Sequence, residues 1–396
     1  INSMHHLAEI LKRRLPLMLI YLANLFLSFH YFTTAYVNSS FLGVHVSANT
    51  VNALYMLASV LNIAIFLYVS TFLRAFGNYR LTLIFALLDL LSVFGLAYAT
   101  ELQFILPLFV LHQALVPMIL FNLDVFLEHQ TKDEGVTGET RGIFLTITNL
   151  ALVLSPLFLA WLNVGDHDFS KAYLLSGLFL MPLILIVGIS MRGFKDETYR
   201  HFNLDYEFVT FLKNKNLGAV FAVNFLLQLF YVFMVIYMPI YLTVIVGFSW
   251  QDFSLMLSIA LLPFLLFELP AGELADHKFG EKEMMGAGFV IMAVSLAILS
   301  YLHAPSFAVF ATALFMTRLG AALVEVTSES YFFKQTKEGD ADLLGIFRIT
   351  RPVSYLVGPI LGGVVLTMTN YQNMFLALSV VMLFGLFFVY RITDTR

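Results

Sequence analysis

Residues 272–282 read GELADHKFGEK, a short polar stretch between two long apolar segments, and the rest of the chain is organised around it. Gly272 and Gly280 stand eight residues apart in it, with Asp276 midway between them and basic residues around the second glycine. Gly280 permits a tight reversal that a residue with a side chain would resist. Asp276 falls where an apolar segment ends, so its carboxylate can cap or pair with a neighbouring helix end. We therefore expect a tight connection between two membrane helices.

The composition indicates an integral membrane protein. Of the 396 residues, 60% are hydrophobic and only 12% are charged. A soluble domain with so few charges could not cover its own surface, so the lipid bilayer must be its solvent. The net charge of -4 is uninformative about nucleic acid, and no basic patch suggests such a partner. Cysteine is absent, which excludes a disulfide framework and a thiolate metal site.

Apolar runs divide the chain into twelve predicted spanning helices, because most runs are near the ~20 residues that a membrane helix needs. We place them at about 15–37, 48–72, 79–99, 102–127, 142–163, 171–191, 216–246, 250–271, 283–301, 304–330, 341–367 and 370–392. A charged interruption separates six helices from six. The predicted parts are an N-terminal segment 1–14, a bundle 15–191, a central connection 192–215, a second bundle 216–392 and a tail 393–396.

The distribution of basic residues predicts the orientation in the membrane. Lysine and arginine gather in the N-terminal segment, the even-numbered connections and the tail, whereas the odd-numbered connections carry only Lys171. Basic connections stay on the cytoplasmic side. We therefore expect a multi-pass protein of the cell's inner membrane with both termini in the cytoplasm.

The two halves of the sequence repeat each other. Residues 124–132 align with residues 329–337, Asn24 aligns with Asn224, and Tyr31 aligns with Tyr231. Such a duplication predicts two similar six-helix bundles.

The stretch at 272–282 resembles the loop signature G-x-L-x-D-x-x-G-x-[RK] of the major facilitator superfamily, and the six-plus-six duplication is similar to that superfamily's architecture. The resemblance covers the whole chain and is to the superfamily rather than to one branch. It implies an all-α membrane protein with two pseudo-symmetric six-helix bundles that rock around a central substrate site. In the first half the equivalent stretch, 69–80, keeps Gly77 and Arg80 but has Leu73 where the aspartate would stand.

Ionisable residues are concentrated in the predicted tenth and eleventh helices. Arg318, Glu325 and Glu329 lie on one helical stripe, and Arg348 and Arg351 share a face of the next helix. Burial of such groups in a membrane is costly, so they are candidates for function. Arg318 would bind substrate or hold a carboxylate ionised, and Glu325 would titrate. The alternative is that Glu325 and Glu329 pair with Arg348 and Arg351 to lock the cytoplasmic end.

His30 and Asp89 are the candidates for proton coupling in the first half. Histidine changes charge near neutral pH, and the resemblance places His30 on a cavity-lining helix. Asp89 is expected on a helix at the outer side of the bundle, either protonated or hydrogen-bonded within it. His112 is interpreted like His30, and for both a satisfied helix contact is the alternative. No metal-ligand spacing appears, so we expect no metal site and no cofactor.

Uncharged polar residues could wall a cavity for the substrate. Asn224, Gln228 and Tyr231 share one helical face, and Gln113 is the first-half counterpart of Arg318. The alternative is hydrogen bonding between helices, worth about 1 kcal/mol each. The predicted cavity residues are Asn24, Tyr31, Gln113, Asn224, Gln228, Tyr231 and Arg318.

The sequence predicts a secondary active transporter for a small organic solute, coupled to protons. No catalytic signature and no phosphate-binding glycine loop is present, so we expect neither an enzyme nor an ATP-driven pump. The aromatic, sparsely charged first half favours efflux. Two alternatives stay open: uptake of an organic anion or nutrient recognised by Arg318, and a non-transporting membrane sensor or scaffold. The expected partners are lipid, solute and protons, and the expected state is a monomer.

Overall fold

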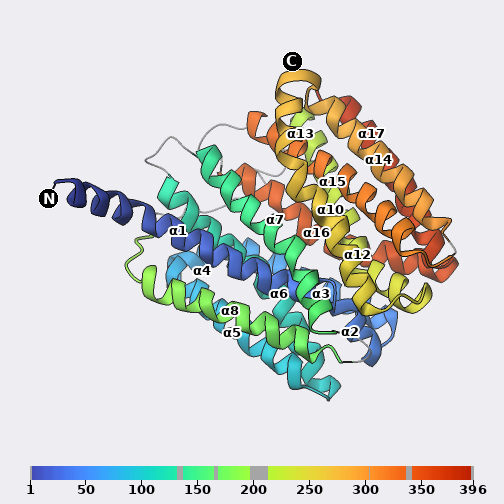
Figure 1. The fold of residues 1–396 in the computed structure, drawn as a ribbon, viewed down its shortest axis with the longest axis horizontal. Coiled ribbons are helices and arrows are strands. Elements are labelled where there is room, and N and C mark those ends of the chain that lie inside the picture. The colour runs from blue at the N-terminus through green and yellow to red at the C-terminus, as the bar shows by residue number, and fades with distance from the viewer. Residues whose placement is uncertain are drawn as a thin grey trace. The chain divides into compact units, whose positions relative to one another are not determined.

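The computed structural model describes residues 2–131, 137–164, 168–196, 213–302, 304–335 and 341–393, and in these ranges the chain is helical without any strand (Figure 1). In chain order the helices are α1 (Asn2–Ala35), α2 (Asn38–His45), α3 (Ala48–Leu67), α4 (Val69–Phe76), α5 (Asn78–Tyr98), α6 (Leu102–Thr131), α7 (Thr137–Trp161), α8 (Ser170–Ser190), α10 (Lys215–Ile236), α11 (Met238–Ile240), η1 (Tyr241–Ile245), α12 (Trp250–Leu266), α13 (Glu268–Leu274), η2 (Ala275–Phe279), α14 (Glu281–Ser300), α15 (Phe307–Gln335), α16 (Ala341–Met368) and α17 (Tyr371–Arg391). The predicted all-α fold is confirmed.

Within the described ranges, eleven helical spans are long and apolar enough to cross a membrane. The predicted span at 250–271 differs, because α12 has 17 residues and is followed by the separate helix α13. Pro270 gives the physical reason, since its ring clashes with the carbonyl of the residue four positions earlier and breaks a continuous helix there. Each of the other predicted runs overlaps one of the spans.

The described residues pack as two compact units. The first is drawn from Ile1–Ala35, Ala64–Ser155 and Asp168–His201, and the second from Tyr36–Ile63, Pro156–His167 and Phe202–Arg396. These limits do not coincide with the predicted bundles 15–191 and 216–392, whose boundaries stay a prediction.

In the first unit, α1 lies against α6 and α8, and α5 lies against the same two helices. Their contact surfaces form an apolar core that includes Ile20, Leu27, Phe126 and Leu180, each almost fully buried. In a membrane, van der Waals packing between such side chains helps to hold the helices together. Four helices therefore enclose the interior of this unit.

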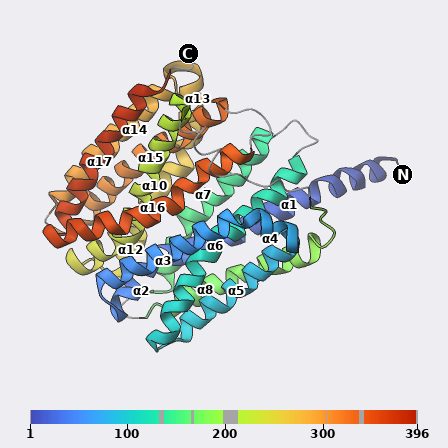
Figure 2. The same ribbon diagram turned by 180° about the vertical axis from the view of Figure 1, so that it is seen from behind.

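In the second unit, α14 packs between α15 and α17, and α10 packs on α15, α16 and α17. Figures 1 and 2 show α14 and α17 side by side from opposite directions. Helix α15, which carries the predicted Arg318 and Glu325, is thus held by neighbours on several sides.

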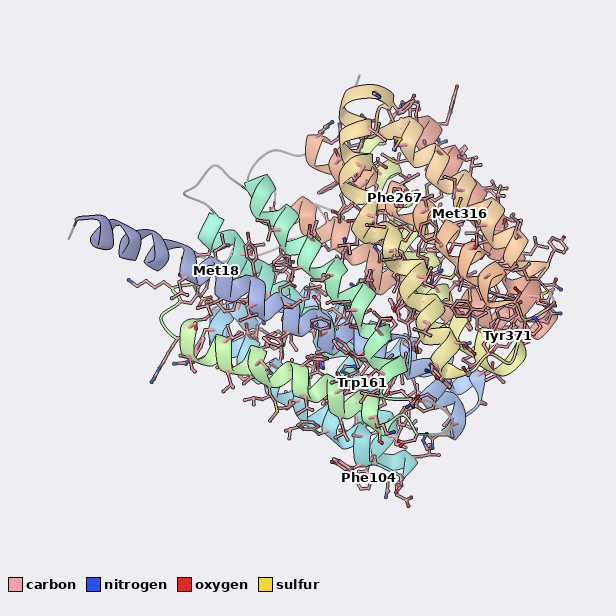
Figure 3. The ribbon with its side chains drawn as sticks, in the orientation of Figure 1. Met18, Phe104, Trp161, Phe267, Met316 and Tyr371 are labelled. Carbon is pink, nitrogen blue, oxygen red and sulfur yellow. The ribbon has the colours of Figure 1, made fainter. Side chains whose placement is uncertain are left out.

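Large apolar side chains cover the outside of the helices. Met18 on α1 is 58% exposed and Trp161 on α7 is 78% exposed, and Figure 3 labels both. Phe104 and Met316, also labelled there, are exposed on α6 and α15. Exposed apolar surface of this extent is expected where lipid is the solvent.

Helices α14 and α15 touch through a pair of glycines. A Cβ on Gly288 would lie 2.7 Å from the carbonyl oxygen of Gly320, and a Cβ on Gly320 would lie 2.6 Å from that of Gly288. Small residues let membrane helices approach this closely.

We predict that Gly288→Ala lowers the unfolding temperature, because the added methyl overpacks the contact at a cost of about 1–3 kcal/mol. The matched control is Gly286→Ala on the same helix, where a Cβ meets only side-chain atoms at 3.9 Å. Thermal unfolding of both variants in detergent checks this. Equal unfolding temperatures for the two would contradict the close contact.

Candidate functional site

The polar stretch that organises the sequence is not a loop, because it is helical through Phe279 in α13 and η2, and only the reversal at Gly280 is as predicted. Gly280 has φ 87° and ψ 154°, directly before α14, which confirms the expected reversal. Gly77 has nearly the same conformation, φ 73° and ψ 155°, directly before α5. The two turns are therefore built alike. Gly272 lies in α13 near Val326, Arg80 is exposed, and the side chain of Asp276 falls outside the part of the chain that the structure describes.

The turn at Gly77 has no aspartate of its own, and the N-terminus of α5 is capped instead by Asp196. Leu73, at the position of the signature aspartate, is buried. Asp196, from the connection after α8, accepts a hydrogen bond from the backbone N–H of Asn78 at 2.8 Å. Its other carboxylate oxygen lies 2.5 Å from where a Cβ of Gly77 would be. A carboxylate at a helix N-terminus pairs with unsatisfied N–H groups.

We predict that Asp196→Ala destabilises the first unit by about 0.5–1 kcal/mol, because the N-terminus of α5 loses its cap. Asp196→Asn keeps an acceptor oxygen and should lose less. Thermal unfolding of the two variants in the same detergent provides the measurement. An Asp196→Ala protein as stable as the unmodified chain would show that this cap is not needed.

Arg318 and Glu325 lie on α15 and both contact α10. The hydroxyl of Tyr231 on α10 donates a short hydrogen bond to Glu325 Oε2. Arg318 donates from Nη1 to Thr317 Oγ1 at 2.9 Å and to Met234 Sδ at 3.0 Å. The two candidate residues therefore face one neighbouring helix, as their spacing predicts.

Arg318 is a buried cation with unused hydrogen-bonding capacity. The residue is 2% exposed, and its guanidinium lies 5.5 Å from the ring centroid of Phe230. Tyr36 contributes a further polar group that acts on Arg318, a phenol. Nη2 is buried and has no hydrogen-bond partner among the described residues. A guanidinium can neither accept a hydrogen bond nor lose its charge, so Nη2 can only donate a hydrogen bond to an acceptor.

The other predicted members of this region lie around it. Glu329, Arg348 and Arg351 are partly buried, and Arg351 is close enough to act on the charge of Glu325. Their role in locking the cytoplasmic end stays a prediction. Asn224 accepts a hydrogen bond from Gln228 at 3.4 Å, so these two residues share a face as expected.

In the first unit, Asn24 joins two helices. Its side-chain amide donates to the carbonyl of Phe144 and to Thr148 Oγ1, both on α7 and both at 2.9 Å. This matches the alternative interpretation, hydrogen bonding between helices. Tyr31 and Gln113 are partly buried. For all three residues, contact with a substrate stays a prediction.

The first unit buries a carboxylate between two imidazoles. Asp89 Oδ2 lies 2.8 Å from His30 Nε2, and Oδ1 lies 2.7 Å from His112 Nδ1. All three side chains are buried from solvent, and they come from α5, α1 and α6. The expected hydrogen bonding of Asp89 within the bundle is confirmed.

The sequence spacing gave no indication of this His–Asp–His cluster as a unit, and it also missed Thr34 and Ser176 beside it. The three residues bring two ring nitrogens and a carboxylate oxygen within 4.8 Å of one another, and the expectation of no metal site stays a prediction. Asp89 is 59 positions from His30 and 23 positions from His112 in the chain. Such residues meet only through helix packing, which no local sequence pattern reveals. Both carboxylate oxygens of Asp89 are hydrogen-bonded to the imidazoles.

Comparison with known proteins agrees with the fold. Residues 220–396 match the family model described as Major Facilitator Superfamily. The structure is similar to that of the nucleoside transporter NupG, with a TM-score of 0.72 and 14% identity over 96% of this chain and 100% of that one. It is also similar to a POT family transporter in complex with 5-aminolevulinic acid, with a TM-score of 0.77 and 13% identity over 94% and 95% of the two chains. No curated protein matches the chain. The predicted resemblance is confirmed.

Proposed function

We propose that this chain, a membrane transporter of the major facilitator type, moves a small organic solute by alternating access and uses protons as the coupling ion. The shared fold supports transport, because transporters built from such repeats hold their substrate near mid-membrane between the halves. Export is the proposed direction, since the first half offers aromatic side chains and few charges to an amphipathic solute.

The hydrogen bond between Tyr231 and Glu325 carries the proposal of proton coupling. An ionised carboxylate can only accept, so the Tyr231 hydroxyl must donate to it. Once Glu325 takes up a proton, its carboxyl gains a donor and keeps acceptor capacity, so the bond to Tyr231 loses its charge-assisted strength and either group can donate. Protonation therefore weakens a contact between α10 and α15. An ionisable group within membrane helices is costly to bury, so its presence there is a reason to assign it a function.

We predict that Glu325→Gln abolishes accumulation driven by a pH gradient and leaves solute exchange intact, because glutamine keeps the hydrogen bond but cannot titrate. His30→Ala should act in the same way. Flux in reconstituted vesicles is the measurement, with Glu283→Gln, at an exposed position of α14, as the control. Full accumulation in both test variants would contradict the assignment.

A second candidate function is the uptake of an organic anion recognised by Arg318. The observation that favours it is the unpartnered Nη2 of a residue that is 2% exposed. A buried guanidinium gains most from an anionic acceptor, which it can bind in two-pronged geometry. The structural neighbour crystallised with 5-aminolevulinic acid, which carries a carboxyl group, so this fold accommodates such a solute.

We predict that Arg318→Ala loses stabilisation by carboxylate solutes and keeps stabilisation by uncharged ones. A thermal-shift screen of a solute library measures this, because a ligand of the folded state raises its unfolding temperature. Arg318→Lys retains the charge but not the planar guanidinium that binds a carboxylate through two hydrogen bonds. Its unfolding temperature should therefore rise by an intermediate amount with carboxylate solutes. Equal shifts for anionic solutes in all three proteins would rule out the anion candidate.

The same vesicles separate transport from a sensor or scaffold. A solute that shifts the unfolding temperature is tested for flux into vesicles that contain the purified protein. Flux above that of protein-free vesicles supports transport. Binding without flux, for every solute that binds, would favour the non-transporting alternative.

A further inference from the structure

The His–Asp–His cluster in the first unit extends beyond its three ionisable members. Ser176 on α8 places its hydroxyl 2.8 Å from His30 Nδ1, and Thr34 on α1 places its hydroxyl 3.2 Å from His112 Nε2. Both residues are buried from solvent. Each imidazole thus has the Asp89 carboxylate on one nitrogen and a hydroxyl on the other.

The carboxylate determines where protons sit. An ionised Asp89 can only accept, so His30 donates from Nε2 and His112 donates from Nδ1. This fixes one tautomer for each neutral ring. His30 Nδ1 and His112 Nε2 are then the two atoms that can gain a proton.

The surroundings of His30 satisfy the ring in both protonation states. In the neutral state, the Ser176 hydroxyl donates to Nδ1. In the protonated state, Nδ1–H donates to the Ser176 carbonyl oxygen at 3.1 Å, and the hydroxyl turns to the His30 carbonyl oxygen at 2.9 Å. The change requires only the rotation of one hydroxyl.

The surroundings of His112 have the same property. Thr34 can donate to the neutral Nε2 at 3.2 Å. When Nε2 carries a proton, the Thr34 hydroxyl accepts a hydrogen bond from Nε2–H and donates one to the carbonyl oxygen of Tyr31, also at 3.2 Å. A buried polar group that is satisfied in two states avoids the cost of an unmade hydrogen bond in either.

Charge balance favours the binding of one proton. With Asp89 ionised and both rings neutral, the cluster carries one buried negative charge. Among the described residues, the two imidazoles are the ionisable groups that act on this carboxylate, and α8 contributes the uncharged Ser176. A single added proton makes the cluster neutral, and neutrality is the cheapest state for a buried site.

We infer that His30, Asp89 and His112, with Ser176 and Thr34 as positioning residues, form a buried binding site for one exchangeable proton in the first unit. The inference rests on the proposed function only for the use made of that proton, because proton binding itself needs no solute. Ser176 and Thr34 act by supplying a hydroxyl that serves either protonation state of its ring.

The test is a pH titration of the full-length protein in lipid nanodiscs, monitored by NMR of ¹⁵N-labelled histidine side chains. The sequence has 10 histidines, and single His→Gln variants assign the signals. His45, which is exposed, serves as the internal control for a histidine outside the cluster. We expect one cluster imidazole to pass from neutral to protonated between about pH 5 and 9 while its N–H to Asp89 persists. Unchanged protonation of both rings across this range would overturn the inference.

Ser176→Ala tests the positioning role. It removes the hydroxyl that donates to neutral His30, whereas the carbonyl that accepts from protonated His30 remains. The protonated fraction of His30 at a given pH should therefore increase, because only its neutral form loses a hydrogen bond. Thr34→Val removes the donor to neutral His112 and also the acceptor of its protonated form, and because the loss costs a charged group more, the protonated fraction of His112 should decrease. A protonated fraction that stays unchanged in both variants, with unfolding temperatures also unchanged, would overturn the role of the hydroxyls.

Two further measurements keep the interpretations separate. Zn²⁺ added alone should leave the cluster signals unchanged, and stoichiometric loss of the N–H signals would assign a metal site in place of the proton site. Proton binding in a protein that shows no pH-driven flux would contradict the proposed function and leave the proton site standing. pH-driven flux without titration of the cluster would contradict the proton site and leave the proposed function standing.

Discussion

The cost of placing a charge within membrane helices governs this structure. The chain is 60% hydrophobic, so each buried ionisable group must be paired, neutralised or used. Asp89 is held between two imidazoles, and Glu325 accepts from a phenol. Among the described residues, Arg318 donates to a hydroxyl and a thioether and lies near a phenol and an aromatic ring, and its Nη2 has no hydrogen-bond partner. These different surroundings are the basis for proposing a proton site at Asp89 and an anion site at Arg318.

Helix packing places these groups where they can act. In the second unit, the close contact of Gly288 with Gly320 brings α14 against α15, the helix that carries Arg318 and Glu325. In the first unit, α1, α5, α6 and α8 surround the cluster and each contributes a side chain to it. Apolar contacts therefore determine which polar atoms meet, and the chemistry follows from the arrangement of the helices.

The sequence was sufficient to predict the helices and the turns, because both follow from local physics. Apolar runs of spanning length and a glycine that must adopt a positive φ are visible in the chain itself. The division of the span at 250–271 could also have been read from Pro270. Pairings over long distances could not be predicted: Asp196 caps α5 from 118 residues away, and Ser176 reaches His30 from 146 residues away. No periodicity encodes such contacts.

The spacing of Arg318 and Glu325 did predict a shared face, since seven residues make nearly two helical turns. The partners on that face, Met234 and Tyr231, depend on how α10 packs and were not predicted as partners. His112 was considered as one isolated histidine, and only the fold shows that it shares a carboxylate with His30. Sequence thus located most of the ionisable residues, whereas the structure was needed to group them.

The most direct test of proton coupling is to drive protons with the solute. Vesicles that contain the purified protein and a trapped pH-sensitive dye, held at zero membrane potential and without a pH gradient, receive a solute gradient on one side. Because coupling between two bound species is reciprocal, movement of the solute should move protons and change the internal pH. Solute flux that leaves the internal pH unchanged would contradict the account.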